Sequence, residues 1–261
     1  MPMMTMSDGC AIHYRFDGRE GRPVLMLSNS LGTTIDMWEP QVAPLAEHFR
    51  VLRYDNRGHG ASDVADGPYT VERIARDAKE LIEGLGLGQI VFCGLSLGGM
   101  VGMWLGANAS SLVSRAVLSN TSAHIGLPEV YDQRNALIAQ EGMGAAASGI
   151  IQRWLSKDFL DRDTAMTAKL LAMVAGIPPA GYMAAAIAVR DMDLRAALPS
   201  IAMPVLVIAG ALDPATPVAM GQAIAETIPH ARLAILDAAH LSNIEKPEEF
   251  NRLVISFLAE D

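Results

Sequence analysis

The segment Gly94-Leu95-Ser96-Leu97-Gly98 constrains the fold more than any other stretch of this chain. It follows an apolar run at residues 90–93 and precedes a stretch from residue 99 that can form a helix. A Gly-x-Ser-x-Gly sequence between a strand and a helix is typical of a nucleophile elbow, a turn so tight that its backbone is strained. Glycines on both sides remove side chains that would clash there. The pattern therefore predicts a Ser96 hydroxyl raised above the sheet, at the start of a helix that favours negative charge.

Three fixed positions also occur in ordinary turns, so the surroundings of the motif matter. Other runs typical of strands lie at residues 11–16, 23–28, 50–55, 115–120, 204–210 and 232–236. Helical patterns separate several of them, at residues 36–46 and in an amphipathic stretch that ends near Gly84 and has Thr70 as its expected N-cap. Strands that alternate with helices predict an α/β fold, a mostly parallel sheet with helices on both faces.

Residues 124–199 depart from this alternation. They are rich in alanine and methionine at helical spacing, with breaks at Gly142, Gly144 and the pair Pro178-Pro179. We therefore expect a core in two parts, residues 1–123 and residues 200–261, with residues 124–199 as a helical lid. Sites in such sheets lie at the carboxyl ends of the strands, so the lid is expected to cover the site.

Composition and charge exclude several classes of function. The 261 residues are 51% hydrophobic and 19% charged, which indicates a globular α/β domain with a substantial core. The net charge of −9, without a basic patch, argues against a nucleic-acid partner. The N-terminus lacks the pattern of a secretion signal and no segment has membrane-spanning length, so we expect a cytoplasmic protein with no membrane partner.

The pattern of cysteines and glycines predicts neither a metal site nor a cofactor site. Cys10 and Cys93 are not spaced as metal ligands and are expected to be free thiols in a reducing compartment. No Cys/His cluster, P-loop or dinucleotide-binding motif is found in the sequence, so we expect no metal and no organic cofactor. The sequence leaves the oligomeric state open, and a homo-oligomer remains an option.

Two further polar residues follow predicted strands in the order that an elbow requires. A serine hydroxyl needs a base, and the base needs an acid that fixes its tautomer, in the order serine, acid, histidine. Asp213 follows the strand at 204–210, and His240 follows the strand at 232–236. Ser96, Asp213 and His240 are therefore the expected catalytic residues. Asp237 is a rival acid, but it lies only three residues before His240 and is less favoured.

Each of these residues also has an ordinary structural explanation. Asp213 precedes a proline and could form a turn, and His240 could be a surface histidine. Their agreement in type, order and position favours the catalytic interpretation. The negative charge that develops on the attacked carbonyl oxygen would then meet two backbone N–H groups, expected from Leu97 and, in the loop after residue 28, from Leu31.

These residues resemble the α/β-hydrolase superfamily along nearly the whole chain, and one branch in particular. The 3-oxoadipate enol-lactonases are resembled by residues 29–34 with Met37-Trp38, by residues 54–60 and by the elbow. Three further segments are more specific to this branch: Arg153-Trp154-Leu155, residues 188–195 and residues 238–245. The loop Arg57-Gly58-His59-Gly60 is mainly structural in the superfamily. The resemblance implies hydrolysis of the enol-lactone of the β-ketoadipate pathway of aromatic compound degradation, through an acyl-enzyme.

That substrate is a small anionic lactone, and an acidic protein needs a local cation for its carboxylate. Arginine suits a carboxylate, and the lid contains Arg134, Arg153, Arg190 and Arg195. Arg190 is the favoured ligand, because it lies in a lactonase-like segment, and Arg134 is second. The alternative for each is an exposed helix face, or for Arg190 a pair with Asp191 or Asp193. Ser30 and Trp154 are expected to line the substrate pocket, although a buried lid tryptophan without ligand contact is the competing view for Trp154.

Two other functions remain open. A general carboxylesterase or perhydrolase of the same fold would accept neutral acyl groups and need no lid arginine. A non-catalytic ligand-binding protein of this fold would keep the pocket without turnover, because fold does not determine function.

Overall fold

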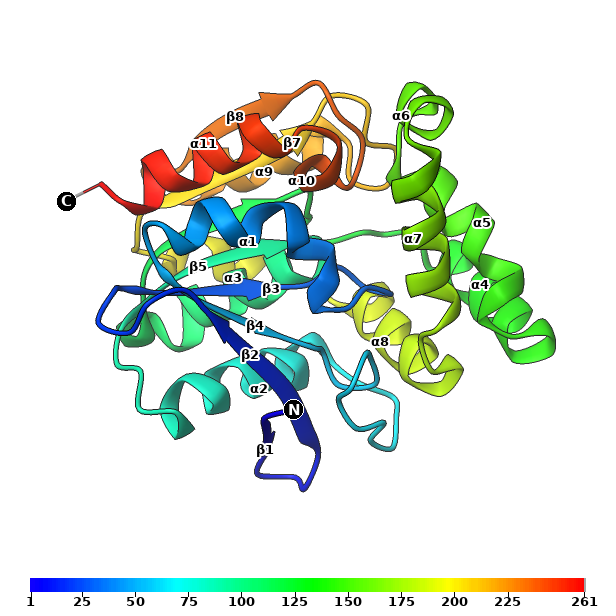
Figure 1. The fold of residues 1–261 in the computed structure, drawn as a ribbon, viewed down its shortest axis with the longest axis horizontal. Helices are drawn as coiled ribbons and strands as arrows, with labels where there is room; N and C mark the ends of the chain where they lie inside the picture. Colours follow the sequence, from blue (N-terminus) through cyan, green and yellow to red (C-terminus); the bar gives the residue numbers. More distant parts are fainter. Residues whose placement is uncertain (261) are drawn as a thin grey trace.

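An eight-stranded sheet crosses the centre of the molecule, in a computed structural model that describes residues 1–260 (Figure 1). The strand order is β1-β2-β4-β3-β5-β6-β7-β8. β2 pairs antiparallel with β1 and β4, and all the other neighbours are parallel. The strands are β1 (Met3–Thr5), β2 (Ala11–Asp17), β3 (Val24–Ser28), β4 (Arg50–Tyr54), β5 (Ile90–Leu95), β6 (Val113–Ser119), β7 (Val205–Gly210) and β8 (Arg232–Leu236).

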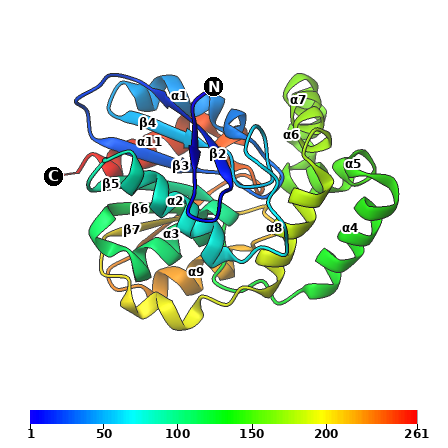
Figure 2. The same cartoon turned by 90° about the horizontal axis from the view of Figure 1, so that it is seen from below.

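Helices cover both faces of the sheet. α1 and α11 pack together on one face, while α2, α3 and α9 lie on the other (Figures 1 and 2). The mostly parallel α/β sheet predicted from the sequence is confirmed. The core helices are η1 (Ile35–Trp38), α1 (Glu39–Ala46), α2 (Val71–Gly84), α3 (Leu97–Asn108), η2 (Ser110–Leu112), α9 (Val218–Thr227), α10 (Ser242–Glu245) and α11 (Pro247–Leu258).

Local chemistry explains where the helices begin. The Thr70 hydroxyl accepts the Arg73 N–H at 3.0 Å, so Thr70 is the predicted N-cap of α2. The single helix expected at residues 36–46 is instead a 3₁₀ turn, η1, followed by α1. Pro40 lies in the first turn of α1, where its missing N–H leaves no broken helical hydrogen bond.

A helical insertion separates β6 from β7. It contains α4 (Pro128–Glu141), α5 (Met143–Trp154), α6 (Lys157–Arg162), α7 (Thr164–Ala175), α8 (Pro179–Asp191) and η3 (Arg195–Ser200). We call α4 to α8 the lid helices. They lie beyond the carboxyl ends of the strands (green and yellow in Figure 1), where the sequence predicts a lid. β6 and β7 still pair in parallel, with Ala116 opposite Val205, so the insertion leaves the sheet continuous.

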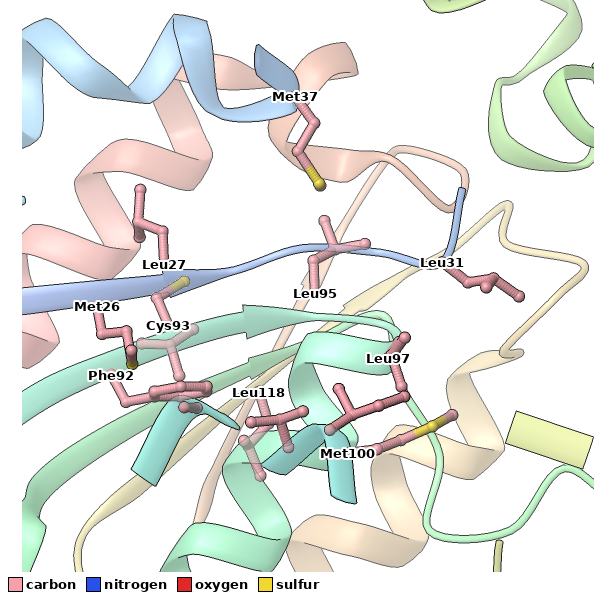
Figure 3. Packing of buried hydrophobic residues seen from close by; sticks show 14 of the residues in the cluster. Met26, Leu27, Leu31, Met37, Phe92, Cys93, Leu95, Leu97, Met100 and Leu118 are labelled. Atoms are coloured by element: carbon pink, nitrogen blue, oxygen red, sulfur yellow. The ribbon is translucent and has the colours of Figure 1, made fainter. Parts of the chain in front are cut away.

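The centre of the sheet is closely packed around the elbow. All six residues of β5 are buried. Figure 3 shows Phe92 and Leu118 on one side of this strand and Leu97 and Met100 at the start of α3. Burial of each such side chain stabilises the fold by roughly 1.5–3 kcal/mol, so β5 is a firm base for the residue that follows it.

No single helix within residues 1–260 is both long and apolar enough to cross a membrane. α7 and α8 together are long and apolar enough, but their axes are bent by 95°. Cys10 and Cys93 are both free and buried.

Candidate active site

The backbone at Ser96 has the strain that the elbow motif predicts. Its φ of 58° and ψ of −114° lie outside the regions that L-residues favour. A Cβ at Gly94 would lie 2.1 Å from the Gly98 carbonyl oxygen, and a Cβ at Gly98 would lie 2.0 Å from the Ser28 carbonyl oxygen. Glycine is therefore required on both sides of Ser96. The Thr121 hydroxyl, two residues after the end of β6, donates to the Ser96 carbonyl oxygen at 2.7 Å and holds the turn in place.

The buried Asp213 carboxylate receives five hydrogen bonds. Its Oδ1 accepts the N–H groups of Ala215 at 2.8 Å and Thr216 at 3.0 Å. Its Oδ2 accepts from the Thr216 hydroxyl at 2.7 Å, Asn120 Nδ2 at 3.0 Å and His240 Nδ1 at 2.8 Å. Burial opposes ionisation, but the neighbouring His240 and the hydrogen bonds lower the pKa of Asp213 to about 2. The carboxylate is thus ionised at neutral pH and holds the proton of the imidazole on Nδ1, leaving Nε2 as the acceptor.

Ser96 and His240 line the same cavity at the carboxyl edge of the sheet. The cavity measures about 500 Å³ with its open mouth included. The sequence-predicted residues Ser30, Leu31 and Trp154 also line it, and so does Arg134. The rival acid Asp237 lies elsewhere: its side chain is 80% exposed and faces Lys246. The full lining is Ser30, Leu31, Ser96, Met100, Ile125, Tyr131, Arg134, Ile150, Arg153, Trp154, Tyr182, Val189, Ala215, Thr216 and His240.

Two backbone N–H groups beside the cavity have no partner in the described chain. Leu97 is the first residue of α3, so its N–H has no acceptor within the helix. The Leu31 N–H makes no hydrogen bond with any group of residues 1–260, although its neighbour Gly32 donates to His59 Nε2 at 3.0 Å. Figure 3 shows Leu31 beyond the end of β3 and Leu97 at the start of α3. Both groups are available to an oxygen that becomes negatively charged.

His59 holds the loop that carries Leu31. Its ring is fully buried, and because Nε2 accepts from Gly32, Nδ1 donates to the Arg57 carbonyl oxygen at 3.1 Å. Burial lowers the pKa of His59 to about 4, so the ring is neutral at physiological pH. This arrangement fits the structural role that the sequence resemblance implies for the loop.

The buried neutral His59 makes stability depend on pH. Between the ordinary pKa of 6.5 and the folded pKa of about 4, the unfolded chain binds a proton that the folded chain does not. The free energy of unfolding is therefore unaffected by His59 above pH 6.5. As pH falls from 6.5 toward about 4, it decreases by roughly 3 kcal/mol. We expect His59→Gln to reduce the proton uptake on unfolding by about one proton, so that stability falls less between about pH 7 and about pH 4.5. Urea unfolding at the two pH values measures this. An identical pH dependence in both proteins would contradict the assignment.

The four lid arginines considered as carboxylate ligands occupy different environments. Arg153 lines the cavity and makes no hydrogen bond or ion pair with any group of residues 1–260. Arg134 also lines it, and its Nη1 donates to the Tyr182 hydroxyl at 2.9 Å. Arg195 is exposed and pairs with Asp193.

The expectation that Arg190 faces the site is wrong. Its side chain does not line the cavity, because its guanidinium pairs with Asp132 at 2.5 Å and Asp191 at 2.7 Å on the outer surface. The alternative pairing with Asp191, left open from the sequence, is the one observed. Among the described residues, Arg153 is the lid arginine that lines the cavity without a hydrogen bond or ion pair.

Several site residues were not predicted from the sequence. Asn120 and Thr216 both bind the Asp213 carboxylate. Asn120 ends the predicted strand at 115–120, which could have indicated it, whereas Thr216 lies in the loop three residues after Asp213. Tyr131 and Tyr182 line the cavity from α4 and α8, where helical spacing alone does not separate them from ordinary core residues. Burial raises the pKa of both tyrosines, so their hydroxyls stay protonated at neutral pH. Within residues 1–260, no cluster of three His, Cys, Asp or Glu side chains could hold a metal ion.

Comparison with known proteins agrees with this geometry. A sequence profile described as the Alpha/beta hydrolase family matches residues 21–253. The 3-oxoadipate enol-lactonase 2 of Acinetobacter baylyi is 38% identical over 244 residues, which cover 94% of this chain and 91% of that protein. The crystal structure of the enol-lactonase from Burkholderia xenovorans LB400 matches with a TM-score of 0.97 and 41% identity, covering 99% of this chain and 100% of that one.

A second solved structure is similarly close. The crystal structure of a hydrolase from Pseudomonas aeruginosa PA01 matches with a TM-score of 0.96 and 45% identity, covering 99% of this chain and 98% of that one. The elbow, the sheet topology and these relatives lead to the same conclusion. The chain belongs to the alpha/beta hydrolase family and is an ester-hydrolysing enzyme.

Proposed function

We propose that this enzyme hydrolyses a small enol-lactone that carries a carboxylate, 3-oxoadipate enol-lactone, in the β-ketoadipate pathway. The observation that carries the proposal is Arg153, which has no partner within residues 1–260 and lines the same cavity as Ser96 and His240. The Acinetobacter relative is named a 3-oxoadipate enol-lactonase and the Burkholderia structure an enol-lactonase, and both names support this proposal. The two free cysteines fit a reducing compartment, and we propose the cytoplasm.

The proposed reaction begins with attack on the lactone carbonyl. His240 Nε2 takes the Ser96 proton as the oxygen attacks, and Asp213 stabilises the imidazolium that forms. The carbonyl oxygen becomes negative and accepts hydrogen bonds from the Leu31 and Leu97 N–H groups. When the tetrahedral intermediate collapses, the ring C–O bond breaks and the enol oxygen leaves, taking the proton from His240.

The second half of the reaction releases the acyl group. The expelled enol becomes a ketone, which makes ring closure unfavourable. His240 then takes a proton from a water molecule, whose oxygen attacks the acyl carbonyl and forms a second oxyanion beside Leu31 and Leu97. Collapse breaks the bond to Ser96, and His240 returns the proton to the serine oxygen.

The free carboxylate of the substrate is assigned to Arg153 and Arg134. Arg153 can offer its whole guanidinium fork, because it has no other partner within residues 1–260. Arg134 keeps its bond to Tyr182 and adds positive charge beside Arg153. Ser30 and Trp154 form further parts of the wall. In a protein with a net charge of −9, this local charge is what makes the cavity attractive to an anion.

Replacing Arg153 tests the anion site against a matched arginine outside it. We expect Arg153→Ala to lower kcat/KM for the enol-lactone by roughly 100-fold, because the variant loses a bidentate charged hydrogen bond. Hydrolysis of p-nitrophenyl acetate, which has no carboxylate, should change little. Arg190→Ala should leave both substrates unaffected, since Asp132 and Asp191 already occupy that guanidinium. Equal losses on both substrates in Arg153→Ala would instead favour a general carboxylesterase.

A further inference from the structure

The end of lid helix α5 is hydrogen-bonded to the loop that carries His240. The Leu241 N–H donates to the Trp154 carbonyl oxygen at 3.0 Å. Two residues beyond Trp154, the Ser156 N–H donates to Glu245 Oε1 at 2.8 Å and the Ser156 hydroxyl donates to Glu245 Oε2 at 2.7 Å. All three bonds cross from the lid to the second part of the core. These bonds fix the position of the lid relative to the core more narrowly than apolar packing does.

The Glu245 carboxylate is buried without a positively charged partner among the described residues. It is only 7% exposed, and no lysine, arginine or histidine pairs with it within residues 1–260. Burying a carboxylate without a cation is costly unless hydrogen bonds compensate. The two bonds from Ser156 and a third from the Ala239 N–H, at 3.3 Å, supply that compensation. The carboxylate therefore joins Ser156 in the lid to the residue before His240.

Residues on both sides of this connection line the cavity. Arg153 and Trp154 come directly before it in the lid, and His240 lies between Ala239 and Leu241 in the core. The distance between the proposed carboxylate ligand and the proposed base thus depends on the bonds of Glu245. A cavity whose anion site moves relative to the base holds the lactone carbonyl less well over Ser96.

We propose that Glu245 and Ser156 are positioning residues. They hold Arg153 at a fixed distance from His240 and so favour substrates that bear a carboxylate. This inference rests on the proposed function. It predicts that breaking the connection weakens turnover of the anionic lactone more than turnover of a neutral ester. A purely structural pair would affect both substrates alike.

The first test removes the hydroxyl bond of Ser156 and leaves its backbone N–H bond to Glu245 in place. Ser156→Ala should lower kcat/KM for the enol-lactone about tenfold, chiefly through KM, and leave p-nitrophenyl acetate nearly unchanged. Because Ser156 also caps α6 by accepting the Phe159 N–H, Ser156→Asp is the companion variant. It keeps a capping acceptor, but its side chain cannot donate to Glu245, so it should lose at least as much activity on the lactone as Ser156→Ala. Ser156→Thr keeps the hydroxyl and should retain wild-type selectivity. Glu245→Gln changes the other partner of the bond and should cause the same preferential loss on the lactone, while Glu249→Gln, an exposed neighbour, controls for its change of charge.

A double-mutant cycle with Arg153→Ala decides whether the connection acts through that arginine. If it does, Ser156→Ala should cause no further loss on the lactone once Arg153 is absent, because both changes remove the same interaction. Additive losses, or equal losses on lactone and ester, would overturn the inference. If Arg153→Ala itself leaves the ratio of lactone to ester turnover unchanged, the carboxylate site of the proposed function fails, and this inference fails with it.

Discussion

Ser96→Ala is expected to lower kcat for every ester or lactone substrate by about 10⁵- to 10⁶-fold, because the attacking oxygen is lost. The elbow places Ser96 on the same cavity as His240, in a backbone conformation that only a tight turn imposes. The variant should keep the fold, since the Ser96 backbone bonds to Ser119 and Thr121 do not involve its side chain. Single-turnover kinetics and circular dichroism provide the measurement and its control.

The same variant separates catalysis from binding. Ser96→Ala should still bind the reaction product, 3-oxoadipate, with an affinity close to that of the wild type, measured by calorimetry. Residual activity above one hundredth of the wild type would contradict the role of Ser96 as the nucleophile. A wild-type protein that bound the lactone without turnover would support the ligand-binding alternative.

Asp213→Asn is expected to lower kcat by about 10⁴-fold, through the tautomer of His240. The N–H groups of Ala215 and Thr216 face Oδ1, so the carbonyl oxygen of the new amide will take that place. Its NH₂ group then faces His240 Nδ1 and Asn120 Nδ2, both of which contact Asp213 Oδ2 in the wild-type protein. The imidazole must turn its lone pair to the amide and its proton to Nε2, where it can no longer accept the Ser96 proton.

The rival acid supplies the control for this prediction. Asp237→Asn removes an equal charge from an exposed position three residues before His240 and should leave kcat unchanged. A large loss in Asp237→Asn, with activity retained in Asp213→Asn, would reverse the assignment. Urea unfolding of both variants at neutral pH checks that the difference is not one of folding.

The elbow and the acid–base pair were predictable because backbone constraints determine them. Gly94 and Gly98 are required wherever a strand turns this sharply into a helix, and the collisions found for a Cβ at either position show why. Asp213 and His240 follow β7 and β8, whose apolar runs are visible in the sequence. Carboxyl ends of parallel strands meet at one edge, so residue order alone brings these side chains together.

The lid was predictable as helices but not as a substrate-binding surface. Arg190 and Arg153 both lie in helical segments that resemble the lactonases, and their spacing does not show which one faces inward. The partner that draws Arg190 outward, Asp132, lies 58 residues away on another helix. The bond between Ser156 and Glu245 spans 89 residues, and no local pattern indicates it. Tertiary contacts of this kind appear only with the structure.

The central claim is that this cavity hydrolyses an enol-lactone with a carboxylate. It is tested most directly by following the loss of enol-lactone absorbance with purified protein, beside p-nitrophenyl acetate and a neutral lactone. We expect saturable turnover of the enol-lactone with the highest kcat/KM of the three substrates, and no turnover with Ser96→Ala. Hydrolysis of the neutral substrates without hydrolysis of the enol-lactone would contradict it.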